Sequence, residues 1–192
     1  MLSEALLILK DAVNNHLSMS SGWSASDSDH GQVVFLDSER VEALDFKIDA
    51  VSLVLVNVEE ETTLRPDDPH RRALLNGASQ KAKPPIHLNA YVLFVARFKD
   101  YKQSLQYISL ILRFFLKNRL LDHESTPTLS DRIEKLTMEL VTLPFSEQNH
   151  LWGILRTAYM PSLLYKVRMI VFQDEDAVVV PPILEPTVRI QP

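Results

Sequence analysis

The sequence predicts a mixed α/β (α+β) fold in which helices flank a central β-sheet. Residues 86–98 form the longest candidate strand, and both of its faces are apolar around Leu93 and Val95, which is typical of a strand covered on both sides. Residues 101–115 carry a wide apolar stripe at helical spacing, which suits a helix laid across a sheet. A second amphipathic helix is expected close to the N-terminus.

The N-terminal helix is expected at residues 3–17. Ser3 can accept a hydrogen bond from the first free backbone N–H groups of that helix. Residues 18–31 are interpreted as a loop rich in Ser and Asp, and Trp23 inside it either packs over the edge of the core or contacts a partner. The apolar face of the helix consists of Leu2, Leu6, Leu9, Val13 and Leu17.

Strands are expected at residues 32–36 and 51–58, ahead of the central strand. Leu44, Phe46 and Ile48 share one parity, which favours a further strand between these two. The central strand then alternates over residues 86–98. Its more regular face carries Ile86, Leu88, Ala90, Val92, Phe94, Ala96 and Phe98.

The helix after the central strand has the clearest boundaries. Asp100 and Gln103 form an Asp-x-x-Gln pattern, which is a capping signal at a helix start. The expected buried stripe consists of Tyr101, Leu105, Ile108, Leu112 and Phe115, widened by Ile111 and Phe114.

The C-terminal half is expected to contain a strand, a short helix and another strand. We interpret residues 133–143 as a strand because apolar and polar residues alternate there and Pro144 ends the run. Residues 146–156 are expected to form the helix and residues 163–172 the last strand, with Lys166 and Arg168 on one face. An aromatic cluster that determines the fold is expected under these elements, formed by Trp152, Tyr159, Pro161 and Tyr165.

Composition excludes several classes of function. The 192 residues include only 4 Gly, too far apart for a dinucleotide fingerprint or a P-loop. The absence of cysteine excludes disulfides, Cys-ligated zinc and thiol catalysis. A net charge of −5 argues against a dedicated nucleic-acid binder. The length predicts one domain, or one domain with appendages.

We expect no cofactor, metal or catalytic residue. Two acidic–His clusters could in principle hold a metal, but they lack ligands at helical spacing and lie in polar loops. An acid–base site near His87, Asn89 and residues 59–61 is an alternative from a different functional class. The two acidic–His clusters are Asp27, Asp29 and His30, and Asp67, Asp68 and His70.

A basic segment, residues 65–83, joins two of the expected strands. It is much longer than a typical hairpin loop, and loops of this length are often functional or disordered. It is either a solvated loop or a basic arm that docks on an acidic surface of a partner; a phosphate site is disfavoured because no aromatic residue accompanies the charges. The candidate partner-binding residues are Arg65, Arg71, Arg72, Lys81 and Lys83.

The composition changes after Gln173. Four of the 11 prolines lie in the last 12 residues, and proline keeps a chain extended because it lacks the N–H donor of a helix or ladder. Residues 174–192 are therefore expected to form an extended arm that lies on its own domain, residues 1–173, or on a neighbour. The candidate partner-binding residues of the arm are Val178, Val179, Val180, Ile183, Leu184, Val188 and Ile190.

Three motifs resemble one protein family. They are LVNVEEE at residues 55–61, PPIHLNAYVLF at residues 84–94 and LWGILRTAYMPSLLYKVRM at residues 151–169. In this order they are similar to the cap, or tail-terminator, proteins of extracellular contractile injection systems, phage-tail-like particles such as the Photorhabdus virulence cassettes. Relatives often have glycine before the Tyr-x-Pro-Ser stretch, where this chain has Arg156, Thr157 and Ala158.

The resemblance implies a twisted central sheet like that of phage tail terminators, and a structural role without catalysis. Such proteins form a hexameric ring that closes the inner tube and sheath and stops their growth. The implied partners are other copies of the chain and the tube and sheath proteins, with no nucleic acid and no membrane insertion. A tail-assembly adaptor or chaperone is the nearest alternative.

The first residues lack the basic start that is typical of a signal peptide. The apolar stretches are far shorter than the roughly 20 residues that a membrane span needs. We therefore expect synthesis and assembly in the cytoplasm, followed by incorporation into a particle that can be released.

Overall fold

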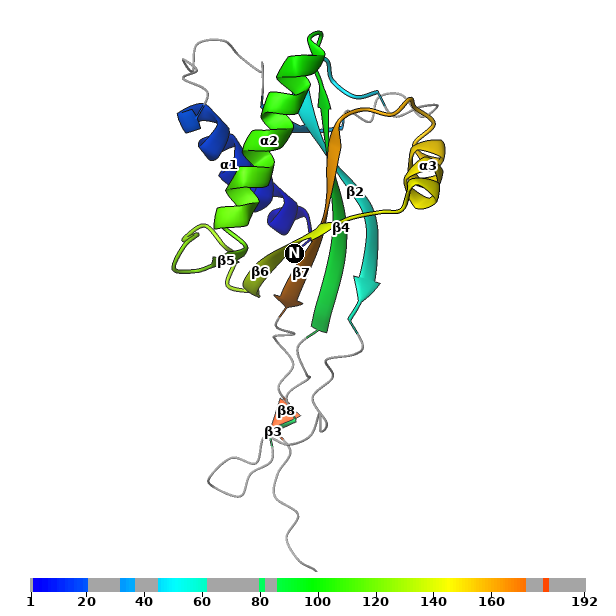
Figure 1. Ribbon diagram of the computed structural model, residues 1–192. Coiled ribbons are helices and arrows are strands. Elements are labelled where there is room, and N and C mark those ends of the chain that lie inside the picture. Colours follow the sequence, from blue (N-terminus) through cyan, green and yellow to red (C-terminus); the bar gives the residue numbers. More distant parts are fainter. Residues whose placement is uncertain are drawn as a thin grey trace, which may run out of the picture.

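The computed structural model describes residues 2–20, 32–36, 45–61, 80–81, 86–171 and 178–179. Its central feature is a six-stranded sheet with the order β1-β2-β4-β7-β6-β5. Helices α1 and α2 lie on one face of this sheet and α3 lies on the other (Figure 1). The mixed α/β prediction is therefore confirmed. The helices are α1 (Leu2–Ser20), α2 (Tyr101–Lys117) and α3 (Phe145–Ile154), and the strands of the sheet are β1 (Val33–Phe35), β2 (Ala50–Glu60), β4 (Ile86–Arg97), β5 (Leu120–Asp122), β6 (Ile133–Val141) and β7 (Ser162–Val171).

The predicted central strand is β4, which pairs antiparallel with β2 on one side and β7 on the other. Phe94 is buried on the face that carries α1 and α2, and Leu93 is buried on the α3 face. Two buried faces explain why this strand is apolar in both parities over its second half. The β1 strand runs parallel to β2, whereas the remaining neighbours are antiparallel.

The larger core fills the space between the sheet and the helices α1 and α2. Phe94 and Phe115 of α2 approach with ring centroids 5.6 Å apart, and Tyr165 of β7 lies 4.7 Å from Phe115. Aromatic rings at such distances add to the free energy of burial. The buried residues of α1 are Ala5, Ile8, Leu9, Val13 and Leu17.

A smaller core lies under α3, on the opposite face of the sheet. Trp152 of α3 approaches Phe46 with ring centroids 6.3 Å apart. Leu93 of β4 and Leu164 of β7 supply the sheet side of this core. The buried members are Phe46, Val54, Leu93, Val95, Trp152, Leu155 and Leu164.

The start of α2 is confirmed, and its predicted buried stripe is confirmed in its second half, where Ile111, Phe114 and Phe115 are buried. Asp100 is the N-cap, and its carboxylate accepts a hydrogen bond of 3.0 Å from the backbone N–H of Lys102. Tyr101 and Leu105 are exposed. In the first half of the helix the buried residues are Ser104 and Tyr107, and Tyr107 stacks on Phe98 with ring centroids 4.5 Å apart. The buried residues of α2 are Ser104, Tyr107, Ile111, Phe114 and Phe115.

Several other predictions are wrong in detail. Ser3 is not a cap, because α1 already begins at Leu2, and the helix continues to Ser20 instead of ending at residue 17. Residues 45–49 are not a strand: Phe46 is buried under α3, and Asp49 turns the chain with a φ of 60°. The short strand β5 was not predicted at all.

The predicted aromatic cluster divides between the two faces of the sheet. Trp152 and Tyr159 belong to the α3 side, where their rings meet. Tyr165 lies in the larger core instead, because the side chains of β7 alternate between the two faces. The prediction for the polar face of this strand is confirmed, since Lys166 and Arg168 lie on the α3 side, opposite to Tyr165.

A separate two-stranded sheet joins two segments that are distant in sequence. Strand β3 (Gln80–Lys81) pairs antiparallel with β8 (Val178–Val179). Figure 1 shows this pair apart from the six-stranded sheet, beyond the end where β7 finishes. None of the helices in the described part of the chain is long and apolar enough to span a membrane.

Candidate interaction surfaces

The outer side of α3 is a candidate interaction surface because it exposes large apolar side chains. Phe145 at the start of the helix is 90% exposed, and Ile154 at its end is 78% exposed. Tyr159, in the loop that follows, is 60% exposed. Single exposed apolar residues are ordinary, but a group of them beside a hollow marks a binding surface.

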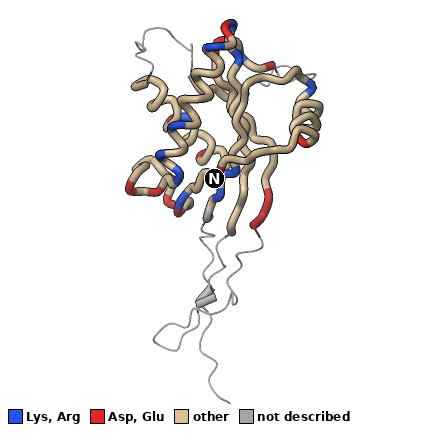
Figure 2. The backbone as a smooth tube through the Cα atoms, viewed as in Figure 1, with Lys and Arg blue, Asp and Glu red and all other residues tan. Residues whose placement is uncertain are grey.

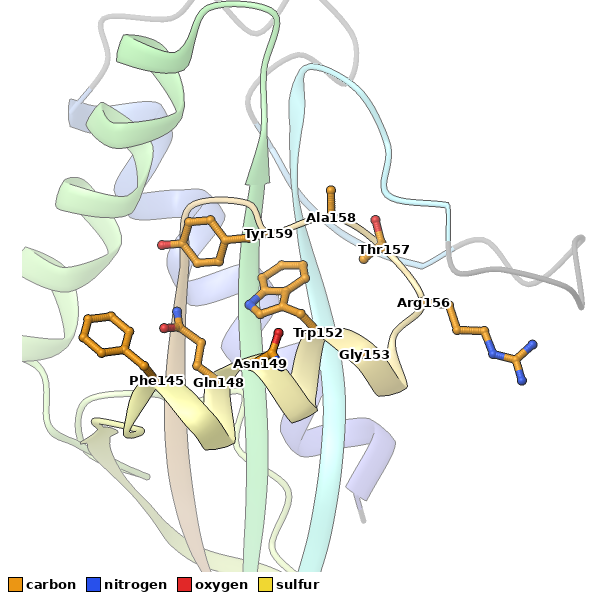
Figure 3. Close-up of a pocket in the computed structure, with 9 residues that line it drawn as sticks. All are labelled: Phe145, Gln148, Asn149, Trp152, Gly153, Arg156, Thr157, Ala158 and Tyr159. Atoms are coloured by element: carbon orange, nitrogen blue, oxygen red, sulfur yellow. The ribbon is translucent and has the colours of Figure 1, made fainter.

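A hollow of about 590 Å³ opens between α3 and the loop that leads to β7 (Figure 3). Phe145, Trp152 and Tyr159 supply aromatic surface to it, and Gln148 and Asn149 supply side-chain amides. An apolar hollow with a few polar groups has the composition of a ligand or peptide site. The loop contributes Arg156, Thr157 and Ala158 to the wall.

Two aromatic residues of the hollow have different roles in the fold. Trp152 is only 5% exposed, and its indole packs into the smaller core against Phe46. Tyr159 meets the indole edge-on, with ring centroids 5.6 Å apart and an interplanar angle of 69°. The packed Trp152 is therefore a rigid floor, whereas Tyr159 offers its free surface to a partner.

Two positions in the wall have unusual backbone or space requirements. Arg156 has a φ of 52°, a left-handed conformation that costs a residue with a Cβ about 1 kcal/mol or more. Gly153 lies in the last turn of α3, and a Cβ added there would meet no atom within 4 Å. The hollow is therefore open at Gly153, and Arg156 is held at its edge against the preference of the backbone.

On the face of the sheet that carries α3, the end of β2 is polar. Figure 2 shows the acidic end of β2, where Glu59 accepts a hydrogen bond of 3.0 Å from the hydroxyl of Tyr91. Glu61 accepts one of 3.0 Å from the amide of Asn89 and lies 3.9 Å from the Nζ of Lys166. Burial, and then the bond to Glu59, raise the pKa of the Tyr91 hydroxyl. The carboxylates thus link three neighbouring strands.

This network contains residues of the acid–base alternative. The structure brings Glu59, Glu61 and Asn89 together, and His87 is linked to them through its backbone oxygen, which accepts from the N–H of Glu61. The carboxylate oxygens already accept hydrogen bonds from side chains of the sheet. Their geometry favours a cross-strand network that stabilises the sheet.

A smaller hollow of about 270 Å³ lies between the end of α2 and β6. Exposed Leu116 and Leu140 lie on its rim, and Tyr165 forms part of its wall. Among the described residues, the buried Tyr165 hydroxyl has no hydrogen-bond partner, and burial raises its pKa to about 12. A buried hydroxyl without a partner leaves its hydrogen-bonding capacity unused.

The structure describes only part of the two predicted docking segments. Lys81 of the basic segment pairs with Val178 of the C-terminal arm in the β3–β8 sheet, and Val179 pairs with Gln80. The two segments therefore meet within one chain. The other candidate residues lie outside the described part of the chain, namely Arg65, Arg71, Arg72, Lys83, Val180, Ile183, Leu184, Val188 and Ile190. Trp23 and both acidic–His clusters are outside it as well.

The family follows from a match that extends over most of the sequence. A family model described as the Pvc16 N-terminal domain matches residues 5–185. The chain belongs to the Pvc16 N-terminal domain family. The resemblance to cap proteins inferred from the three motifs is thereby confirmed. No curated protein sequence matches the chain.

Two solved structures share the fold of this Pvc16 N-terminal domain. One is a cryo-EM structure of the sheath/tube terminator of the extracellular contractile injection system PVC in its extended state, with 16% identity, a TM-score of 0.51 and coverage of 95% of this chain. The other is the tube-terminating cap of the anti-feeding prophage, with 16% identity, a TM-score of 0.56 and coverage of 95%. The matches span 63% and 60% of those two chains.

Sequence reasoning missed the hollow in this Pvc16 N-terminal domain. It assigned Trp152 and Tyr159 to a fold-determining cluster and made no use of Phe145 or Ile154. One signal was available in the sequence: the apolar residues of α3 are not gathered on one face, because Phe145, Leu151 and Ile154 point in different directions around the helix. A short helix whose apolar residues are spread around it exposes those that do not face the core.

Proposed function

We propose that this chain is a structural cap of a contractile injection system. It closes the end of the inner tube and sheath as a ring and stops their polymerisation. The observation that carries the proposal is the fold match over 95% of the chain to two proteins that terminate tubes or sheaths. Both of those are structural proteins, and membership of the Pvc16 N-terminal domain family supports the same role.

The partners of such a cap are other copies of the chain, in a hexamer, and the tube and sheath proteins. A capping ring must bind the last layer of a polymer and present no surface for the next layer. The chain would be assembled in the cytoplasm and then remain in the particle.

The docking elements that we propose are the basic segment around Arg71 and Arg72 and the C-terminal arm after Gln173. Positive charge suits an acidic surface on the tube or a neighbouring subunit, and its contribution falls with ionic strength. An extended apolar arm can add main-chain hydrogen bonds and side-chain contacts to a neighbour. Residues 1–173 would form the cap domain and residues 174–192 the arm.

Particle length tests the capping role. Particles are assembled with and without the chain, purified and measured by electron microscopy. Without the cap, tube and sheath lengths should become variable and the ends should be open. An unchanged length distribution with closed ends would contradict the proposal. Mass spectrometry of the purified particles separates a cap, which stays in them, from an adaptor or chaperone, which leaves.

Variants of the docking elements test the two segments separately. Removal of the residues after Gln173 should leave a folded chain that no longer caps particles. Arg71→Glu with Arg72→Glu should weaken assembly more strongly as salt is lowered, because repulsion is then less screened. The matched control is charge reversal at exposed Lys102 and Arg113 of α2, which should leave particles normal. Normal caps with either docking variant would exclude that segment.

A further inference from the structure

We propose that the hollow beside α3 binds the proline-rich segment at residues 181–186 of a second copy of this chain. The inference rests on the proposed ring, because it supplies a contact between successive copies. The segment reads PPILEP and has proline at positions 181, 182 and 186. Proline-rich segments hold a preformed extended helix and dock on grooves lined by aromatic side chains, at little cost in conformational entropy.

The lining of the hollow matches this occupant. Trp152 provides a fixed aromatic floor, and Phe145 and Tyr159 extend its aromatic surface outward (Figure 3). Gln148 and Asn149 place amides beside these rings, where they can hydrogen-bond the carbonyl groups of an extended peptide. An extended proline-rich peptide leaves its carbonyl groups free for such bonds.

Charge complementarity supports the same segment as the occupant of the hollow. Arg156 stands at the edge of the hollow, and its side chain extends outward from that edge, away from Phe145 and Tyr159 (Figure 3). It forms no ion pair within the described part of the chain. Glu185 immediately precedes Pro186 in the proposed ligand. A carboxylate next to the last proline of the motif complements the guanidinium group of Arg156. The contact also gives a reason for an arginine at a backbone position that favours glycine.

The ligand must come from another copy, because the arm leaves the sheet far from the hollow. Arg156 and Tyr159 lie just before β7, whose 10 residues run away from α3. A strand of that length spans about 33 Å. β8 is paired with β3 beyond the far end of β7 (Figure 1). Pro181 is only two residues after Val179, a reach of at most about 7 Å.

A contact of this kind is head-to-tail, since the arm of one copy meets the α3 side of the next. Repetition of a head-to-tail contact closes a ring when the rotation between copies permits it. The hollow and the arm would therefore be the two complementary halves of one interface between neighbouring copies.

Disulfide trapping tests the contact directly, because the natural chain contains no cysteine. Chains with Arg156→Cys are mixed with chains with Glu185→Cys and oxidised. We expect a disulfide-linked pair only in the mixture of the two. The matched control replaces Arg156→Cys by Ser109→Cys on the exposed side of α2 and should give no such pair. Equal linking in the control would overturn the proposal.

A labelled peptide of residues 179–190 gives a second measurement on the full-length chain. Gly153→Leu places a side chain in the open space and should weaken peptide binding at least about tenfold. Arg156→Glu should weaken it about threefold, and a peptide with Glu185→Arg should restore the loss. No saturable binding, or equal binding by the Gly153→Leu chain, would overturn the assignment. Circular dichroism confirms that each variant is folded.

Three outcomes separate this inference from a contact within one chain and from the proposed function. A chain that carries both cysteines and links only within itself, at every concentration, would show that the hollow takes the arm of its own chain. Trapping between copies with no effect of the chain on particle length would retain this contact and overturn the capping role. Capping that survives Gly153→Leu would retain the cap and overturn this contact.

Discussion

The indole ring of Trp152 meets the phenol ring of Tyr159 edge-on, with centroids 5.6 Å apart. The pair connects the smaller core to the surface, because Trp152 is buried under α3 and Tyr159 is exposed. Because Trp152 is fixed in the smaller core, this part of the hollow is already formed before a partner binds. Preformed sites bind with a smaller entropic cost than sites that fold on binding.

Replacement of Trp152 should affect stability far more than replacement of its exposed neighbour. Trp152→Ala removes a buried aromatic side chain and should lower the free energy of unfolding by about 3–5 kcal/mol. Ile154→Ala, in the same helix, should change it by less than about 0.5 kcal/mol because Ile154 is exposed. Denaturant titration measures both. Similar losses for the two variants would show that α3 is not anchored through Trp152.

Tyr165→Phe should not destabilise the chain at neutral pH. The buried Tyr165 hydroxyl has no hydrogen-bond partner in the part of the chain that the structure describes, so its removal should raise the free energy of unfolding by up to about 1 kcal/mol. Tyr101→Phe, at an exposed site, is the matched control and should leave the unfolding curve in place. A loss of more than about 1 kcal/mol in Tyr165→Phe would reveal a partner for this hydroxyl.

The same hydroxyl predicts a loss of stability in alkali. Burial raises the pKa of folded Tyr165 from 10.0 to about 12, so the folded state holds its proton more tightly than the unfolded state does. The stabilisation is fully present below pH 10 and is lost as the pH rises toward about 12. Denaturant titrations across this window should show a shallower decline for Tyr165→Phe than for the natural chain. Parallel declines would assign the loss to other groups.

Gly153→Ala should stabilise the chain. An added Cβ meets nothing within 4 Å, and alanine favours the helix over glycine by about 0.5–1 kcal/mol. Thermal and denaturant unfolding should both shift upward. A decrease would mean that the backbone at Gly153 needs the freedom of glycine, and would remove the argument that this position keeps the hollow open.

Arg156→Gly should also stabilise the chain, while Arg156→Ala should not. The φ of 52° suits glycine, so relief of the left-handed conformation should add up to about 1 kcal/mol to the free energy of unfolding. Alanine keeps the strain because it keeps a Cβ. Equal stability of the two variants would indicate that the loop relaxes. In the proposed ring, both variants lose the contact with Glu185.

Much of the secondary structure could be predicted from periodicity. The strand at β4 was predicted within one residue at its end, and Asp100 marked the start of α2. Predictions failed where the signal was short or ambiguous. The strand β5 has three residues, too few for a periodic pattern. The shared parity of Leu44, Phe46 and Ile48 predicted a strand, whereas residues 45–49 contain a turn in which Phe46 is buried and Ile48 is exposed.

The candidate site was harder to predict than the fold. The sequence identified polar residues, prolines and charges as candidates, and most of these lie outside the described residues. The hollow beside α3 depends on Phe145, Gly153 and Arg156, whose exposure, open space and backbone angle have no signature in a single sequence. Such properties depend on neighbours that are distant along the chain.

The sequence by itself determined the family and the alternation of helices and strands. It also excluded cysteine chemistry and glycine-rich loops that bind phosphate. Local spacing carries this information, because burial on one face leaves a period of 2 or 3.6 residues in the chain. Only the tertiary structure decided which face of the sheet each aromatic residue enters, and that the basic segment meets the C-terminal arm. These relations come from strand register and helix packing, which join residues by distance in space and leave no local pattern.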